Sequence, residues 1–190
     1  MTMNPYSILK RGIDIIDSNK IEIEKVIRVF ESKGLSTFDG IRPTLPLSAF
    51  PSFEIETEGM NTTWGTTRGQ RHTCSFRCLI TVAAPNISER ESYLNNLTSV
   101  VTGLFRNPQN LEFALSREPP SSDCHRLTVY DSFVGDVRYS SAKEGTIGIA
   151  DFTWVASVHE SIPDLLFRNV PTQSPSVLSP VIREIRDDTV

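Results

Sequence analysis

The stretch from Trp64 to Cys78 brings together residue types that could do chemistry. It reads WGTTRGQRHTCSFRC, with two glycines, three arginines, one histidine and two cysteines four positions apart. Glycine-rich loops cradle phosphates, cysteine and histidine bind zinc, and arginine beside tryptophan contacts nucleic acid. Each of these chemistries needs its own local geometry, which the neighbouring elements must supply.

The pattern after this loop argues against a metal or redox site. From His72 to Ala83 apolar residues recur at the even positions, which predicts a long half-buried strand. Cys74 and Cys78 then share one face of that strand, with their sulfurs about 13 Å apart. That separation is too great for one zinc ion or for a disulfide. We interpret these residues and Cys124 as free thiols, and we expect neither a metal nor another cofactor.

The glycines of the loop do not predict a phosphate site either. Gly65 and Gly69 lie between two predicted strands, and no helix begins after them. We predict a hairpin loop that exposes Trp64, Arg68 and Arg71, and we expect these three side chains to contact a neighbouring subunit. A DNA-binding module that uses the same side chains is an alternative, although the preceding strand is acidic (residues 54–58).

The sequence gives little support for a hydrolase function. It has no G-x-S-x-G motif, and its three histidines are expected at strand edges or in loops. A small enzyme that uses Asp123, Cys124 and His125 is a further alternative, which rests only on their adjacency. We expect the protein not to be an enzyme.

The elements that surround the loop predict an α+β fold. Helical spacing and caps indicate helices at residues 5–17, about 20–33 and 88–107, the last with a capping box from Ser88 to Glu91. Strand patterns fall at residues 53–58, 72–83, 126–130, 133–139 and 147–158, and residues 35–51 read as an extended segment. This order predicts an antiparallel sheet of about four strands with helices on one face.

The last residues have a different composition from the rest. Residues 1–161 read as one domain, whereas residues 162–190 carry four spaced prolines among isolated apolar residues. We expect an extended C-terminal arm that packs on another surface. The formal net charge of −4 argues against a general affinity for nucleic acid or for anionic membranes. Neither a signal peptide nor a membrane-spanning run is evident, and we expect a reducing compartment.

The element order and three local patterns resemble one protein family. The patterns are the W-G-x-x-R-G-x-R-H loop, the YDSFVGDV stretch at residues 130–137 and the WVASV end of the last strand at residues 154–158. Over roughly residues 15–160 the chain resembles the tail terminator, or tail-completion, proteins of long-tailed bacteriophages such as lambda. That family has no catalytic residues to transfer to this sequence.

The resemblance implies a structural protein of the virion neck. Such proteins form hexameric rings that cap the tail tube, end its polymerisation and join the tail to the head. The implied partners are the tail tube protein, a head-completion or connector protein, and the tail sheath if the tail contracts. Genomic DNA would pass through the bore without specific binding, which suits an acidic chain. The protein would be made in the host cytoplasm, with no membrane involved. Another neck component, such as a head-completion or connector adaptor, is the alternative.

Overall fold

The computed structural model describes residues 5–30, 34–66, 69–107, 126–142 and 146–161. The expected C-terminal arm, residues 162–190, lies outside them. The described elements are, in chain order, α1 (Pro5–Ser18), α2 (Lys20–Phe30), β1 (Ser36–Asp39), the short 3-10 helix η1 (Leu47–Ala49), β2 (Ser52–Thr66), β3 (Gly69–Ala83), α3 (Ile87–Arg106), β4 (Arg126–Val134), β5 (Arg138–Ala142) and β6 (Ile147–Ser161).

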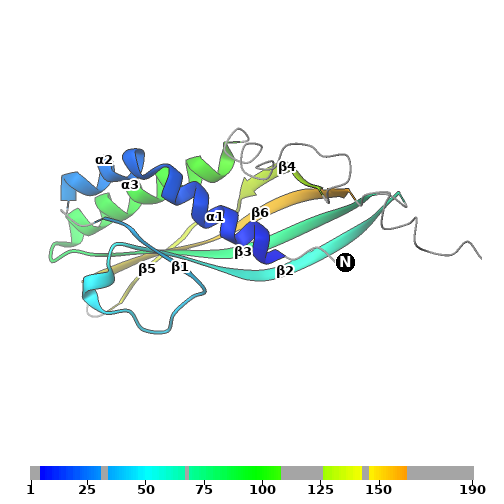
Figure 1. The fold of residues 1–190 in the computed structure, drawn as a ribbon. Helices are drawn as coiled ribbons and strands as arrows, with labels where there is room; N and C mark the ends of the chain where they lie inside the picture. Colours follow the sequence, from blue (N-terminus) through cyan, green and yellow to red (C-terminus); the bar gives the residue numbers. More distant parts are fainter. Residues whose placement is uncertain (1–4, 31–33, 67–68, 108–125, 143–145, 162–190) are drawn as a thin grey trace, which may run out of the picture.

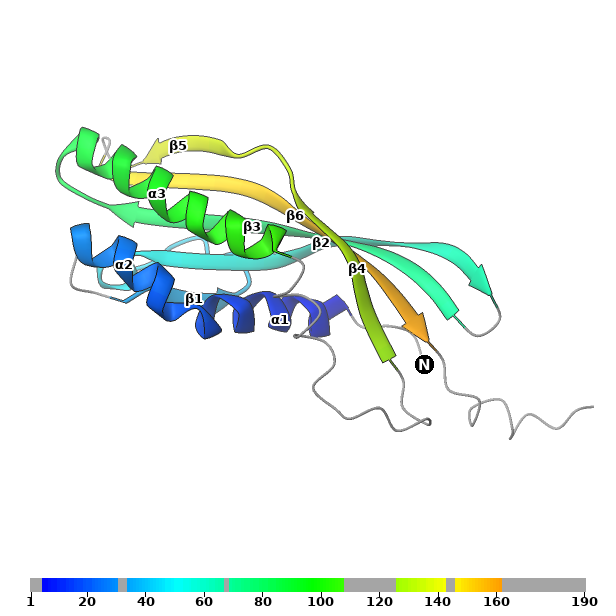
Figure 2. The same cartoon turned by 90° about the horizontal axis from the view of Figure 1, so that it is seen from above.

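The six described strands form one sheet with helices on one side. Its order is β1-β2-β3-β6-β4, and β5 also pairs with β6. β4 pairs with the second part of β6 and β5 with the first part, so both lie at the same edge. The β1–β2 pair is parallel, and the other pairs are antiparallel. All three α-helices lie over one face (Figures 1 and 2). The α+β prediction is confirmed, whereas the expected four strands are too few.

The additional strand at the edge of the sheet comes from the proline-containing segment 35–51, which was predicted only as an extended crossing. Within it, residues 36–39 form β1 beside the start of β2. The backbone N–H of Ser36 donates to Pro51 (3.0 Å), and that of Gly40 donates to Ile55 (2.7 Å). β1 ends before the first proline of the segment. Proline has no backbone N–H to donate, so its position after β1 leaves the hydrogen bonds between β1 and β2 intact.

The hairpin between β2 and β3 is longer and tighter than predicted. The predicted strands ended at residue 58 and began at residue 72, but β2 continues to Thr66 and β3 begins at Gly69. The register shifts between Thr57 and Gly59, so the extra residue Glu58 is accommodated as a bulge and pairing then resumes. The threonines of residues 59–66 favour the extended conformation, which explains why β2 continues beyond the predicted end. The alternation of apolar and polar residues did not reveal the bulge.

The core lies between the helices and the sheet, as the alternation in β3 predicted. Cys74, Phe76 and Cys78 are completely buried on that face. Trp154 of β6 stacks against Phe76 and Phe105, with ring centroids 4.9 and 4.6 Å apart. Each fully buried aromatic side chain stabilises the fold by about 2–3 kcal/mol relative to exposure.

The start of α3 differs in one detail from the prediction. The N-cap is Asn86, whose side chain accepts a hydrogen bond from the backbone N–H of Ser88 at 3.0 Å. The capping box from Ser88 to Glu91 is therefore wrong, because the helix already begins at Ile87. This start places Arg90 one turn into the helix, where its side-chain stem packs over Gly148 of β6.

Candidate functional site

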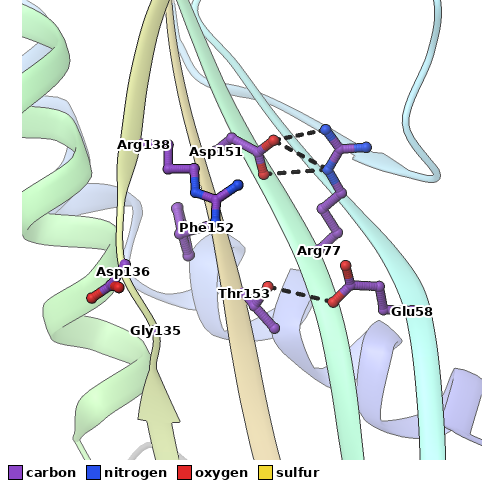
Figure 3. Close-up of a pocket in the computed structure, with 8 residues that line it drawn as sticks. All are labelled: Glu58, Arg77, Gly135, Asp136, Arg138, Asp151, Phe152 and Thr153. Carbon is purple, nitrogen blue, oxygen red and sulfur yellow. Dashed lines mark hydrogen bonds and ion pairs between the residues drawn. The ribbon is translucent and has the colours of Figure 1, made fainter.

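The face of the sheet that the helices do not cover carries a belt of charged side chains. At its centre Arg77 of β3 faces Asp151 of β6 in a forked arrangement (Figure 3). The guanidinium Nη2 lies 2.7 Å from Asp151 Oδ2, and Nε lies 3.2 Å from both carboxylate oxygens. Hydrogen bonds to Asp151 raise the pKa of Arg77 further above its ordinary value, so this guanidinium stays charged. Glu56 of β2 adds a longer contact of 4.0 Å to Nη1 of Arg77.

A shallow hollow of about 490 Å³ opens beside this pair. Asp136 and Arg138 come to it from the β4–β5 connection and from β5, whereas Glu58 comes from the bulge of β2. The carboxylate of Glu58 accepts a hydrogen bond of 3.4 Å from the Thr153 hydroxyl (Figure 3). The charged and hydroxyl side chains of the lining are suited to ion pairing and hydrogen bonding with a polar surface.

Of the three residues predicted to contact a subunit, Arg71 lies near the hairpin that joins β2 to β3. Arg71 is exposed on β3, with its guanidinium 5.8 Å from the centre of the Tyr130 ring of β4. Trp64 belongs to β2, but its side chain lies outside the described part of the chain, as does all of Arg68. Their contact with a neighbouring subunit therefore stays a prediction.

Two aromatic residues of the YDSFVGDV stretch are exposed, which the sequence analysis did not predict. Tyr130 and Phe133 lie on β4 with 55% and 49% of their surface exposed. The register shift of β4 between Val129 and Asp131 turns this part of the strand, which a period-two pattern does not reveal. Together with Arg71 they make the hairpin end of the open face amphipathic.

The cysteines behave as the spacing predicted. Cys74 and Cys78 are free and buried on the helix-covered face. Burial raises the pKa of the Cys74 thiol to about 11 and that of Cys78 well above its ordinary value. Both therefore stay protonated at neutral pH and are poor nucleophiles. The described residues contain no cluster of His, Cys, Asp and Glu able to hold a metal ion. Asp123, Cys124 and His125 lie outside the described residues.

The sequence analysis missed a row of three hydrogen-bonded polar residues, two of which are buried. His72 was expected at a strand edge, but it lies inside the sheet on β3 with 3% exposure. Its Nε2 lies 2.7 Å from Oε2 of Glu160, which is 1% exposed, and its Nδ1 lies 3.0 Å from the Thr62 hydroxyl. The three residues come from β2, β3 and β6, which are adjacent in the sheet. No sequence signal could have paired residues separated by 88 positions.

The order hydroxyl, imidazole, carboxylate is also that of hydrolase triads. Here the imidazole of His72 and the carboxylate of Glu160 are buried, and of the three residues only Thr62 is exposed to solvent. A general base has to reach the proton that it removes from a bound substrate. We therefore interpret these three hydrogen-bonded residues as a structural network that links three neighbouring strands near the β2–β3 hairpin.

The comparisons with known proteins include a distant structural likeness. No family model matches the chain, and no curated protein sequence matches it. Among solved structures, a chain from the "Virion of native gene transfer agent (GTA) particle" is similar over 78% of this chain and 91% of its own length. Its sequence identity is 9% and its TM-score is 0.45, so no property of that particle is transferred to this chain. Within the described residues, no helix is long and apolar enough to cross a membrane.

Proposed function

We propose that the protein is a structural component of a phage-type virion that forms a ring at the head-proximal end of the tail tube. In this role it ends tube polymerisation and joins the tail to the head. The proposal rests on the resemblance of the sequence to tail terminator proteins. The observation that supports it is the division of the sheet into a face covered by all three α-helices and a face with an exposed charged belt.

The charge of the open face fits a passage for DNA. Around the hollow, the carboxylates of Glu56, Glu58, Asp136 and Asp151 outnumber the guanidinium groups of Arg77 and Arg138, and Arg77 is already paired. Fixed positive charge would bind phosphate, whereas a net acidic surface lets DNA slide. We propose that this face borders the bore and that the protein works without catalysis or cofactor. Arg71, together with Trp64 and Arg68, would then lie where one subunit of the ring meets the next.

Removal of the protein from assembling particles tests the proposal. A stop codon early in its reading frame should yield overlong tails that are not joined to heads, and supply of the protein in trans should restore normal particles. Tails of normal length joined to heads without the protein would refute it. Gold labelling in the same particles locates the protein: a label against the portal rather than the tube end would favour a head-completion or connector adaptor instead.

A binding measurement tests the passive role of the bore. The purified protein is mixed with duplex DNA at low salt, where phosphate contacts are strongest. We expect no retention of DNA. Tight binding that weakens steeply with salt would show that the arginines of the open face or of the hairpin engage phosphate.

A further inference from the structure

Two open strand edges lie at the same level on opposite sides of the sheet. The registers join Ser36 of β1 to Ser52, then to Thr81, to Ile149 and finally to Ser140 of β5. Among the described residues β1 pairs only with β2, and β5 pairs only with β6. Their outer backbone groups can therefore pair with another chain. Figure 2 shows the two strands on either side of β2, β3 and β6.

The direction of these strands also suits pairing between copies. β1 runs with β2, β3 runs against it, β6 runs against β3, and β5 runs against β6. β5 and β1 of a single copy are thus antiparallel. When a second copy is placed beside the first by a rotation that keeps the sheet continuous, β5 meets β1 of that copy in antiparallel orientation. Such a contact is head-to-tail, and it closes into a ring when the rotation closes.

On the helix side of the sheet, an exposed aromatic side chain lies beside one edge and a groove lies beside the other. Beside β5, Tyr139 stands on the helix-covered side of the sheet with 53% of its surface exposed. Beside β1 lies a groove of about 190 Å³, which we call the α2 groove. It is lined by four aliphatic residues, three charged residues and one glycine: Ile16, Ile23, Ile27, Leu35, Asp17, Lys20, Glu24 and Gly34. Exposed tyrosines that enter a pocket are frequent anchors of protein interfaces.

The same surfaces are complementary in charge. Arg90 of α3 lines a second hollow with Tyr139, Ser140 and Ser141, and its side chain is only 7% exposed. Its Nη1 is buried without a hydrogen-bond partner, and its Nη2 is 3.7 Å from the Glu91 carboxylate. A buried guanidinium that lacks acceptors is costly, and a further carboxylate would relieve that cost. At the opposite edge the Asp17 carboxylate borders the α2 groove, with its side chain 42% exposed. Its Oδ1 lies 3.7 Å from Nζ of Lys20 and accepts a hydrogen bond of 3.5 Å from the Thr37 hydroxyl, and the exposed part of the carboxylate can face a further cation.

From these observations we propose that β5 of one copy pairs antiparallel with β1 of the next, with Tyr139 in the α2 groove and Arg90 facing Asp17. The occupant of each edge is a second copy of this chain. The inference rests on the proposed function in one respect only, that copies assemble as a closed ring. It adds which surfaces meet in that ring.

Cross-linking between single-cysteine variants tests the pairing. Ser36→Cys and Ser140→Cys are made separately in a Cys124→Ala background, in which the remaining thiols of Cys74 and Cys78 are buried. The two variants are mixed, allowed to assemble, oxidised and analysed on a non-reducing gel with mass spectrometry. We expect a covalent dimer in the mixture that joins residue 36 to residue 140. Thr63→Cys, on an exposed position of β2 towards the hairpin, replaces Ser36→Cys as a matched control and should give no such dimer.

The possible registers between the two strands are covered by two more mixtures. Phe38→Cys with Ser140→Cys and Ser36→Cys with Arg138→Cys test shifts of two residues, because alternate side chains share a face. A dimer in any of the three mixtures supports the pairing. Absence of a dimer in all three overturns it, whether the protein is tested as the oligomeric fraction or as concentrated monomer. Dimers formed by either variant alone would also overturn it, because they indicate a two-fold contact.

The side-chain contacts are tested by the assembly constant. Tyr139→Ala should weaken assembly about 30-fold, the size typical of an interface anchor. Arg90→Glu and Asp17→Arg should each weaken assembly, and the two variants mixed or combined should recover at least part of it. Circular dichroism and melting temperature confirm that each variant is folded. Unchanged assembly in folded Tyr139→Ala would refute the anchor.

The outcomes separate this inference from the proposed function. Rings at tail ends without any of these cross-links would remove the inference and leave the function standing. Conversely, cross-linked rings whose loss leaves tail length and head joining unchanged would remove the function and leave the pairing standing.

Discussion

Replacement of Gly12 by alanine tests how closely α1 approaches the sheet. A Cβ at this position would lie 2.9 Å from a ring carbon of Trp154 and 3.1 Å from Cδ1 of Ile55. Trp154 has no room to withdraw, because it is completely buried and stacked against Phe76 and Phe105. The added methyl group therefore overpacks the core instead of filling a void.

Two opposed effects determine how much Gly12→Ala changes the free energy of unfolding. Alanine in a helix interior is favoured over glycine by about 1 kcal/mol. Overpacking of a well-filled core costs about 1–3 kcal/mol. Since the nearest contact is to a ring held on both sides, we expect the cost to prevail, with a net loss of about 1–2 kcal/mol. For a chain of this size that corresponds to a melting temperature lower by about 2–8 °C.

Gly103→Ala in α3 provides the matched control. No atom lies within 4 Å of a Cβ built at Gly103, which is exposed. Only the difference in helix propensity between glycine and alanine should then act, and we expect a gain of about 1 kcal/mol. Urea unfolding followed by circular dichroism measures both variants. If Gly12→Ala also stabilised the protein, α1 would not be packed against Trp154 as described.

Two other predictions follow from the structure, and a third follows from the sequence. His72→Ala leaves Glu160 buried without its imidazole partner, so urea unfolding should show a loss of about 3–5 kcal/mol, and adding Glu160→Gln should recover part of it. The folded-state pKa of Cys74 is raised from 9.0 to about 11, so its contribution to stability is complete below pH 9 and is lost as pH rises towards 11; wild-type stability should therefore fall more over that range than that of Cys74→Ala. Trp64→Ala combined with Arg68→Ala should give a folded protein that does not form rings, as judged by size-exclusion chromatography and negative-stain microscopy; unimpaired rings would contradict the predicted contact.

Period-two patterns predicted the faces of the sheet well where a strand is regular. In β3 the buried side chains of Cys74, Phe76 and Cys78 alternate with more exposed ones as expected, because one face packs on helices. The two cysteines lie four positions apart on one buried face of this strand, as the pattern predicted. The helix positions followed from apolar spacing in the same way, and α1 and α3 end within about two residues of the predictions.

The features that the sequence did not reveal depend on contacts between distant segments. β1 became a strand only because the start of β2 offers it a parallel partner, which propensity in residues 35–51 does not indicate. The bulge at Glu58 changes which residues share a face, and the pairing of His72 with Glu160 joins β3 to β6. Of the predicted subunit contacts, Arg71 is exposed as expected, but its aromatic neighbour Tyr130 depends on a register shift in β4.

The length of the central strands separates two regions of the protein. β2, β3 and β6 each contain 15 residues, and Arg71 and Thr81 of β3 are ten positions apart, which is about 33 Å of strand. That distance is several times the screening length of about 8 Å in physiological salt. Charges at the hairpin end and at the β1 and β5 edges are therefore electrically independent. Free-energy changes from substitutions in the two regions should add, so one protomer can adjust to one neighbour without altering its fit to another.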